Sequence, residues 1–145
     1  MKNYRCDPPQ STLESVLEEI KKQQPEYVFW TGDSTPHDDP YVSKDEITES
    51  LESITKIVRS YFPESESSFF FSLGNHDSFP NGQQDFEKTE PSKTVLDLLE
   101  YWVPEDQFDL FEKHNIYTND IEEINARVIS LNTQSCDFHN MYLWG

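Results

Sequence analysis

Two short apolar runs, each ending in a glycine and a group of polar residues, constrain the fold of this chain most strongly. The first run, residues 27–31 (YVFWT), leads into the dipeptide GD, and the second, residues 69–73 (FFFSL), leads into GNHD. Continuous runs of β-branched and aromatic residues are typical of strands that are buried on both faces. The sequence therefore predicts two buried strands, each followed by a sharp polar turn.

A helix is expected between these two strands. Ser43 and Glu46 have the spacing of a capping box, and apolar residues then recur at helical intervals until Pro63. Strand, helix and strand in this order predict a parallel pair joined by a right-handed crossover. The carboxyl ends of parallel strands lie at one edge of the sheet, where ligands gather, so we expect GD and GNHD to lie side by side.

The remaining pattern completes an α/β chain without an internal repeat or linker. Ser11 and Glu14 predict a capped amphipathic helix over residues 12–23, which Pro25 ends. Further apolar patterns predict two helices and two strands, near residues 95–102, 108–111, 117 and 127–133. We therefore expect residues 1–145 to belong to one domain.

The charge of the chain disfavours two classes of partner, nucleic acids and membrane surfaces. It carries 28 Asp and Glu against 11 Lys and Arg, a formal net charge of -17, and has no cluster of basic residues. Such a surface repels phosphate backbones and anionic lipid, so we expect no nucleic-acid polymer as a partner. A substrate that carries phosphate would need bound metal cations to neutralise its charge.

The sequence also bears on compartment and cysteine chemistry. It has no apolar run of the roughly 20 residues that span a bilayer, and its first ten residues contain no hydrophobic signal core. Cys6 and Cys136 could form one disulfide, stay as two thiols, or pair with cysteines outside this sequence.

Four residues at or near the glycine turns are candidates for metal and phosphate chemistry. Asp33 can bridge two divalent cations, and Asn75 can ligate one through its amide oxygen. His76 can ligate a metal or donate a proton, and His37 lies four residues after Asp33. The alternatives are structural: a turn or cap aspartate for Asp33 and a solvated loop histidine for His37.

The residues around these candidates have simpler interpretations. We expect Trp30, residues 69–71 and Trp102 to be core residues rather than a lipid-binding stripe. Three acidic residues are predicted to form turns or to orient a neighbouring histidine, namely Asp38, Asp39 and Asp77.

The segments WTGDSTPHD (residues 30–38) and SLGNHDSFP (residues 72–80) resemble the second and third motifs of the calcineurin-like metallophosphoesterases. Within that superfamily the sequence is most similar to the acid sphingomyelinase-like phosphodiesterases. The position of His37, the CDPP segment before the first helix and RVISLNTQSCDFHNMYLW (residues 127–144) support this subfamily. The resemblance implies an α/β fold that is part of a metallophosphoesterase β-sandwich with flanking helices, whose βαβ core carries GD and GNHD.

The resemblance also implies a role for each candidate residue. Asp33 would bridge two zinc ions, and Asn75 would bind the second of them. His76 and His37 would stabilise the transition state or protonate the leaving alkoxide, while water activated by the two metals attacks phosphorus. The implied substrates are phosphodiesters such as sphingomyelin, related phospholipids or nucleotides, and the implied location is secreted or endolysosomal.

Three further motifs of the family are missing from this sequence: an upstream D-x-H, a lone histidine and a G-H-x-H. His114 and His139 do not stand in those contexts, and the family partners of Cys6 and Cys136 would lie outside this segment. Because zinc sites normally have three or four protein ligands, we expect a partial domain, residues 1–145, that binds zinc weakly and has little or no activity alone. Two alternatives stay open: an endopolyphosphatase-like hydrolase and a non-catalytic acidic binding remnant.

Overall fold

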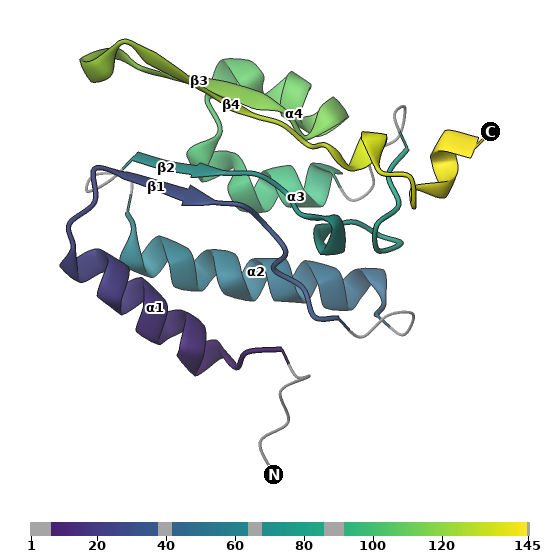
Figure 1. Ribbon diagram of the computed structural model, residues 1–145, viewed down its shortest axis with the longest axis horizontal. Helices are drawn as coiled ribbons and strands as arrows, with labels where there is room; N and C mark the ends of the chain where they lie inside the picture. Colours follow the sequence, from purple (N-terminus) through teal and green to yellow (C-terminus); the bar gives the residue numbers. More distant parts are fainter. Residues whose placement is uncertain (1–6, 38–41, 64–67, 86–91, 145) are drawn as a thin grey trace.

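The structure, a computed structural model, describes residues 7–37, 42–63, 68–85 and 92–144. Its centre is a parallel pair of strands, β1 (Tyr27–Trp30) and β2 (Ser68–Phe71), in which Tyr27 pairs with Ser68 and Trp30 with Phe71. The helix α2 (Lys44–Tyr61) connects them (Figure 1). The predicted parallel strand, helix and strand unit is confirmed.

The N-terminus of α2 is fixed by the predicted capping box. The Ser43 hydroxyl accepts from the Glu46 backbone N–H at 3.3 Å, and the Glu46 carboxylate accepts from the Ser43 backbone N–H at 2.8 Å. Two free N–H groups at the helix start are thereby paired, which defines where the helix begins. One face of α2 then enters the core through Ile47, Leu51, Thr55 and Val58.

The helix α1 (Gln10–Lys22) begins earlier than expected, and the predicted Ser11 and Glu14 capping box is wrong. Pro9 is the N-cap, with φ of -69° and no side-chain cap hydrogen bond. Because proline has its φ fixed near this value, it can start a helix without a polar cap. Glu14 instead accepts a hydrogen bond from the side chain of Gln10 at 2.7 Å.

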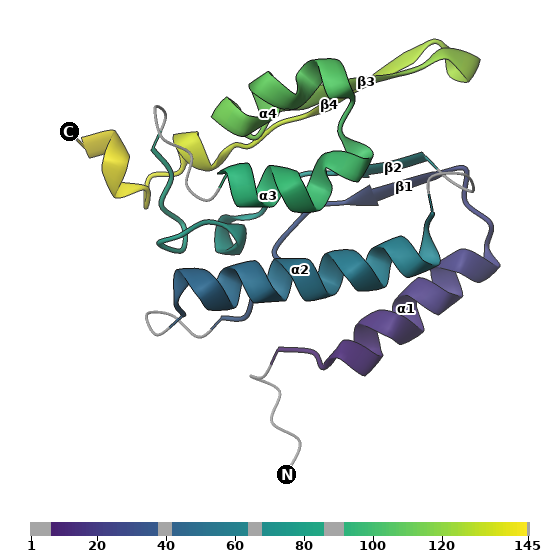
Figure 2. The ribbon, with the colours of Figure 1, turned by 180° about the vertical axis from the view of Figure 1, so that it is seen from behind.

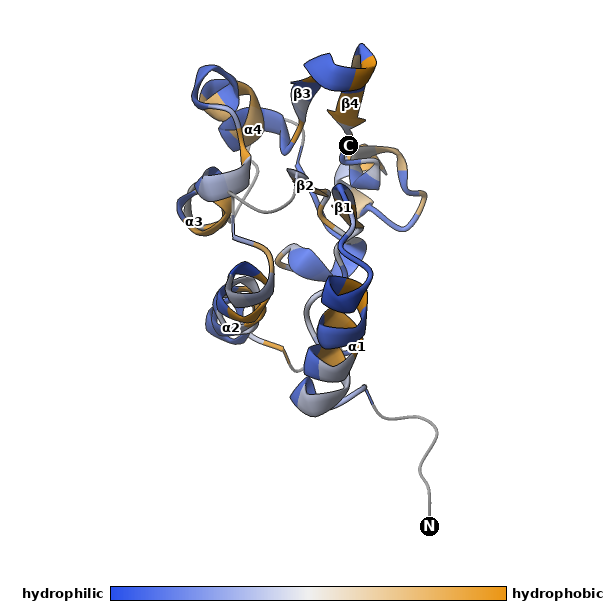
Figure 3. Ribbon diagram, turned by 90° about the vertical axis from the view of Figure 1, so that its left-hand side faces the viewer, coloured by the Kyte–Doolittle hydropathy of each residue, from blue (hydrophilic) through white to orange (hydrophobic). Residues whose placement is uncertain are grey.

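The C-terminal half adds two helices and a hairpin. They are α3 (Ser92–Leu99), α4 (Phe108–His114), β3 (Tyr117–Ile121) and β4 (Ala126–Ser130). The strands β3 and β4 are antiparallel, and short 3₁₀ turns connect or follow the longer elements. Figures 1 and 2 show the hairpin beside the β1 and β2 pair, and Figure 3 shows α2, α3 and α4 stacked on one side of the strands.

An aromatic core joins the helices to β2. Phe69 and Phe71 on β2 are at most 5% exposed, and they pack against Trp102, with ring centroids 4.5 and 6.1 Å away respectively. The expected core roles of Phe69–Phe71 and Trp102 are confirmed, whereas Trp30 is half-buried. Within the described residues, no helix has the length and apolarity needed to cross a membrane.

The expectation that β1 is buried on both faces is wrong. Phe29 points to the face opposite the main core, stacks on Phe70 at 5.3 Å and stays 62% exposed. The reason is that α1 and α2 cover one face of the strand, while Phe29, by strand alternation, projects from the other. An apolar run in the sequence therefore predicts the presence of a strand, but it does not predict which elements cover each face of that strand.

Candidate active site

The GD turn brings the ends of β1 and β2 into backbone contact. Gly32 has φ of +81°, and a Cβ added there would overlap the Gly74 nitrogen and the Ser72 carbonyl oxygen. Asp33 follows in a left-handed conformation, with φ of +57°. Only glycine allows so close an approach of two backbones, so Gly32 determines that the two turns meet.

Asp77 holds these two turns together. Its side chain is 1% exposed, and its Oδ2 accepts hydrogen bonds from the backbone N–H groups of Asp33 at 2.9 Å and Gly74 at 2.8 Å. Its Oδ1 accepts a third from the Ser34 N–H at 2.8 Å. Burial raises the pKa of the Asp77 carboxyl, and the three amide hydrogen bonds oppose that rise.

The role predicted for Asp77 is therefore only partly right. It stabilises a turn as expected, but the groups that it orients are backbone amides rather than a histidine. The other two predicted turn aspartates, Asp38 and Asp39, lie outside the described residues.

Asp33 and Asn75 lie on the two turns that Asp77 connects. The Asp33 carboxylate is exposed, and its Oδ1 accepts from the backbone N–H of His76 at 3.2 Å. Gly74 leaves room for this carboxylate, because a Cβ there would overlap it. The Asn75 carbonyl oxygen accepts from the Gly82 N–H at 2.8 Å, which fixes the backbone at this second candidate ligand.

The rings of His76 and His37 are adjacent and tilted by 52° relative to each other. Their ring centroids are 4.1 Å apart, and His76 is buried whereas His37 is exposed. The backbone oxygen of His76 accepts a hydrogen bond from the Thr35 hydroxyl, and its ring Nδ1 is 2.6 Å from Nδ2 of Asn81. The structure thus brings together all four candidates, Asp33, His37, Asn75 and His76.

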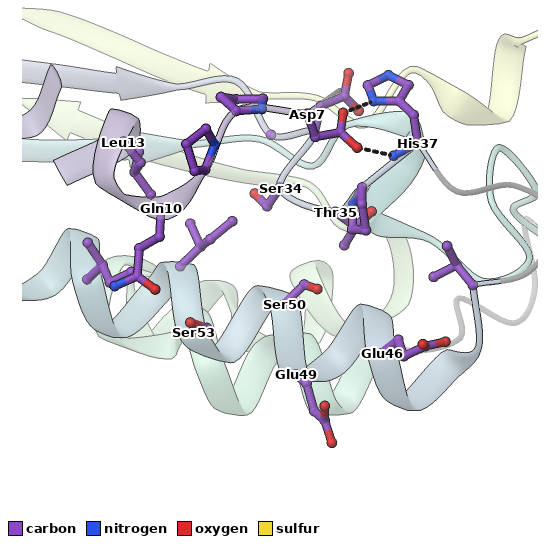
Figure 4. A pocket seen from close by; sticks show the side chains of 18 of the residues that line it. Asp7, Gln10, Leu13, Ser34, Thr35, His37, Glu46, Glu49, Ser50 and Ser53 are labelled. Carbon is purple, nitrogen blue, oxygen red and sulfur yellow. Dashed lines mark hydrogen bonds and ion pairs between the residues drawn. The ribbon is translucent and has the colours of Figure 1, made fainter. Parts of the chain in front are cut away.

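Sequence reasoning did not single out Asp7. Asp7 accepts from the backbone N–H of His37 at 2.9 Å, and its Oδ1 is 2.7 Å from His37 Nδ1 (Figure 4). These interactions with His37 lower the pKa of the Asp7 carboxyl. The sequence offered one signal for Asp7, its position in the CDPP segment. Its contact with His37 spans 30 positions, and no local sequence pattern predicts a contact over such a separation.

A cavity of about 730 Å³ adjoins the GD side of the site. Figure 4 shows it between the start of α1 and the length of α2, with Ser34 and Ser50 projecting toward it from opposite sides. Asp33 and His37 belong to its lining. Apolar side chains supply much of the rest, including Leu13, Trp30, Val42, Ile54 and Ile57.

The donor set fits part of a metal site. A carboxylate, an amide oxygen and two imidazoles are ligands that divalent cations such as zinc accept. Among the described residues, however, no group of three or more His, Cys, Asp and Glu side chains is close enough to hold a metal ion. Cys136 is a free and exposed thiol, and Cys6 lies outside the described residues.

Comparison with known proteins identifies the family. The model of the calcineurin-like phosphoesterases matches residues 6–144, which is nearly the whole chain. The chain belongs to the calcineurin-like phosphoesterase family. The matched range includes both glycine turns, which follow the ends of the parallel strands β1 and β2.

Several relatives carry the names of phosphodiesterases. The chain is 31% identical to Sphingomyelinase phosphodiesterase C of Dictyostelium discoideum, with 90% of the chain and 29% of that protein covered. It is 29% identical to human Acid sphingomyelinase-like phosphodiesterase 3b, covering 90% of the chain and 30% of that protein. It is 32% identical to human Cyclic GMP-AMP phosphodiesterase SMPDL3A, covering 88% of the chain and 29% of that protein. The chain therefore spans less than a third of the length of these relatives.

Proposed function

We propose that this chain is the central segment of a metal-dependent phosphodiesterase of the acid sphingomyelinase-like type. The observation that carries the proposal is the convergence of Asp33, Asn75 and two adjacent histidine rings at one sheet edge, on turns that Asp77 connects. The named relatives support this class of reaction. In the longer protein, the present strands would form part of a β-sandwich with flanking helices.

Asp33 and Asn75 are the proposed metal ligands. Asp33, whose carboxylate is exposed, would be a ligand shared by two zinc ions, and the Asn75 amide oxygen would bind the second. When bound, the two ions would neutralise the phosphodiester and activate water. The chain's own contribution is to fix the spacing of both ligands through Gly32, Gly74 and the buried Asp77.

His76 and His37 are the proposed proton donors. With their ring centroids 4.1 Å apart, both side chains would reach the same phosphate oxygen or leaving group. Asp7 orients His37 through two contacts, and Asn81 contacts His76. A donor that is already oriented loses less freedom when the transition state forms.

The proposed substrates are phosphodiesters with an apolar group, such as sphingomyelin and related phospholipids. The cavity beside His37 supports this, because its partly apolar lining offers space for such a group next to the proton donor. The relative named as a cyclic GMP-AMP phosphodiesterase keeps nucleotides as candidates. We propose a secreted or endolysosomal location on the same family basis. Parallel assays on sphingomyelin, ATP and polyphosphate would separate these substrates from an endopolyphosphatase-like activity.

The test is hydrolysis of bis-nitrophenyl phosphate by the native polypeptide that contains these residues, in the presence of zinc. We expect Asp33→Asn and His76→Ala each to reduce kcat by at least about a hundredfold, because each removes a group that acts in the transition state.

Exposed residues away from the site supply matched controls. Asp109→Asn and His114→Ala lie on α4, and we expect both variants to keep full activity. Full activity in either Asp33→Asn or His76→Ala would overturn the assignment.

A second candidate is a non-catalytic acidic binding remnant. The observation in its favour is that no group of three metal-ligating side chains occurs among the described residues. A zinc-binding measurement distinguishes the two candidates, because tight binding of two zinc ions by the chain would count against the non-catalytic remnant.

A further inference from the structure

The surroundings of the His76 ring fix the position of one of its two nitrogens, Nδ1. Nδ1 is 2.6 Å from Nδ2 of Asn81, and the centroid of the ring is 4.1 Å from that of the tilted His37 ring. The backbone of His76 is fixed at both ends, by Asp33 at its N–H and by Thr35 at its carbonyl oxygen. The ring therefore has a defined orientation in which Nδ1 faces the amide.

Asn81 is held by the loop around it. Directly after it, the Gly82 N–H donates to the Asn75 carbonyl oxygen at 2.8 Å. The Gln83 side chain donates to the His139 carbonyl oxygen at 3.0 Å and accepts from the Met141 N–H at 2.7 Å. The loop that presents Asn81 is thus anchored to the site on one side and to the C-terminal segment on the other.

We propose that Asn81 is a positioning residue that selects the protonation site of the neutral His76 ring. The amide nitrogen of Asn81 can only donate, and a neutral imidazole has one donor and one acceptor nitrogen. Nδ1 is therefore the acceptor, and the ring proton resides on Nε2.

This inference gives the proposed function a specific donor atom. If His76 stabilises a phosphodiester oxygen, as proposed above, the neutral ring does so by donating a hydrogen bond from Nε2, which is the nitrogen away from Asn81. A neutral ring that is already in this form needs no tautomer exchange before it donates. The tautomer of His76 then depends on whether residue 81 donates or accepts a hydrogen bond, and not on the volume of its side chain.

The test reads the tautomer directly. Long-range 1H–15N spectra of the 15N-labelled chain, recorded at alkaline pH so that the imidazole rings are neutral, distinguish protonated Nδ1 from protonated Nε2. His76→Gln assigns the His76 signals. We expect the unmodified chain to show His76 with its proton on Nε2, and a proton on Nδ1 would overturn the proposal.

Substitutions of Asn81 sharpen the test. Asn81→Ala removes the donor, so we expect a mixture of the two tautomers. Asn81→Asp replaces the donor with a carboxylate that only accepts, so we expect the proton to move to Nδ1. Asn125→Asp makes the same change in an exposed turn of the hairpin and should leave the His76 tautomer unaltered. An unchanged tautomer in both Asn81 variants would overturn the proposal.

Kinetics separate this inference from the proposed function. In the native polypeptide, Asn81→Asp should lower kcat by about tenfold or more with little change in KM, because the donor atom is lost while binding groups remain. Full activity of His76→Ala would refute the proposed function and leave the tautomer result intact. A proton on Nδ1 together with an inactive His76→Ala would refute only the role of Asn81.

Discussion

Asp77 stabilises the local structure and also lies within the candidate site. Its buried carboxylate accepts hydrogen bonds from three backbone N–H groups on two turns, with N···O distances of at most 2.9 Å. A carboxylate with several amide donors is a strong acceptor, and removing it leaves those donors without a partner. One side chain therefore maintains the relative position of Asp33 and Asn75.

We expect Asp77→Ala to lower the free energy of unfolding by about 2–5 kcal/mol, because three amides lose their acceptor and a small cavity forms. Urea denaturation followed by circular dichroism measures the change. Asp109→Ala, at an exposed position on α4, is the matched control and should change stability by less than about 0.5 kcal/mol. Equal losses in the two variants would contradict the structural role of Asp77.

Single residues differ in how far the sequence could predict them. Asp33, Asn75 and His76 directly follow two glycines at strand ends, so strand pairing alone predicts that they meet. Asp7 and Asn81 contact the histidines because of the path that their loops take in three dimensions. Neither periodicity nor residue spacing in the sequence predicts the path of a loop, so these two contacts could be found only in the structure.

At the scale of elements, the β3 and β4 hairpin is tied to the strand that leads into the site. The Phe71 N–H on β2 donates to the Tyr117 hydroxyl at 2.8 Å, and the Ser130 hydroxyl donates to the Phe71 carbonyl oxygen at 2.6 Å. Both backbone groups of Phe71 are thus paired with side chains of the hairpin. Burial raises the pKa of the Tyr117 hydroxyl to about 12.

This raised pKa predicts a loss of stability at high pH. The unfolded state loses the tyrosine proton near the ordinary pKa of 10.0, whereas the folded state retains it to a pKa of about 12. The free energy of unfolding therefore has its full value below pH 10 and falls as pH rises toward 12, by up to about 3 kcal/mol from this group.

Denaturation of the chain and of Tyr117→Phe across this pH range isolates the contribution. The variant should be about 1–3 kcal/mol less stable at pH 7, because the buried Phe71 N–H loses its acceptor, and should lack this part of the alkaline decline. Tyr142→Phe, at a side chain that is 55% exposed, should match the unmodified chain. An identical alkaline decline in Tyr117→Phe would contradict the argument.

The elements themselves were largely predictable because their signals are local. Helical spacing after the Ser43 capping box, and aromatic runs before the two glycines, predict α2, β1 and β2 close to their observed bounds. The start of α1 was missed because Pro9 begins the helix without a polar cap. The exposure of Phe29 was missed because it depends on which elements pack on that face.

At the scale of the whole molecule, the described residues supply only part of the proposed metal site. The chain spans 29% to 30% of three phosphodiesterase relatives, and its described residues provide no group of three close metal-ligating side chains. Its formal net charge is -17, so the surrounding field favours cations even where specific ligands are few.

We expect isothermal titration calorimetry of the chain with Zn²⁺ to show only weak binding, because Asp33 and Asn75 provide fewer ligands than zinc sites require. Asp33→Asn should weaken this binding further, and Asp109→Asn should not. Tight binding of two zinc ions would contradict the prediction and would also exclude the non-catalytic binding remnant.

The hydrogen bond from the Asp33 amide to Asp77 closes a loop of 44 positions that contains all of α2. During synthesis, the GD turn leaves the ribosome well before its acceptor exists, and closing such a loop costs conformational entropy that local contacts cannot offset. We therefore expect the turn to take its final shape only after Asp77 has been synthesised and β2 has paired with β1. Substitutions on α2 that slow this crossover would then delay formation of the GD turn although they touch none of its residues.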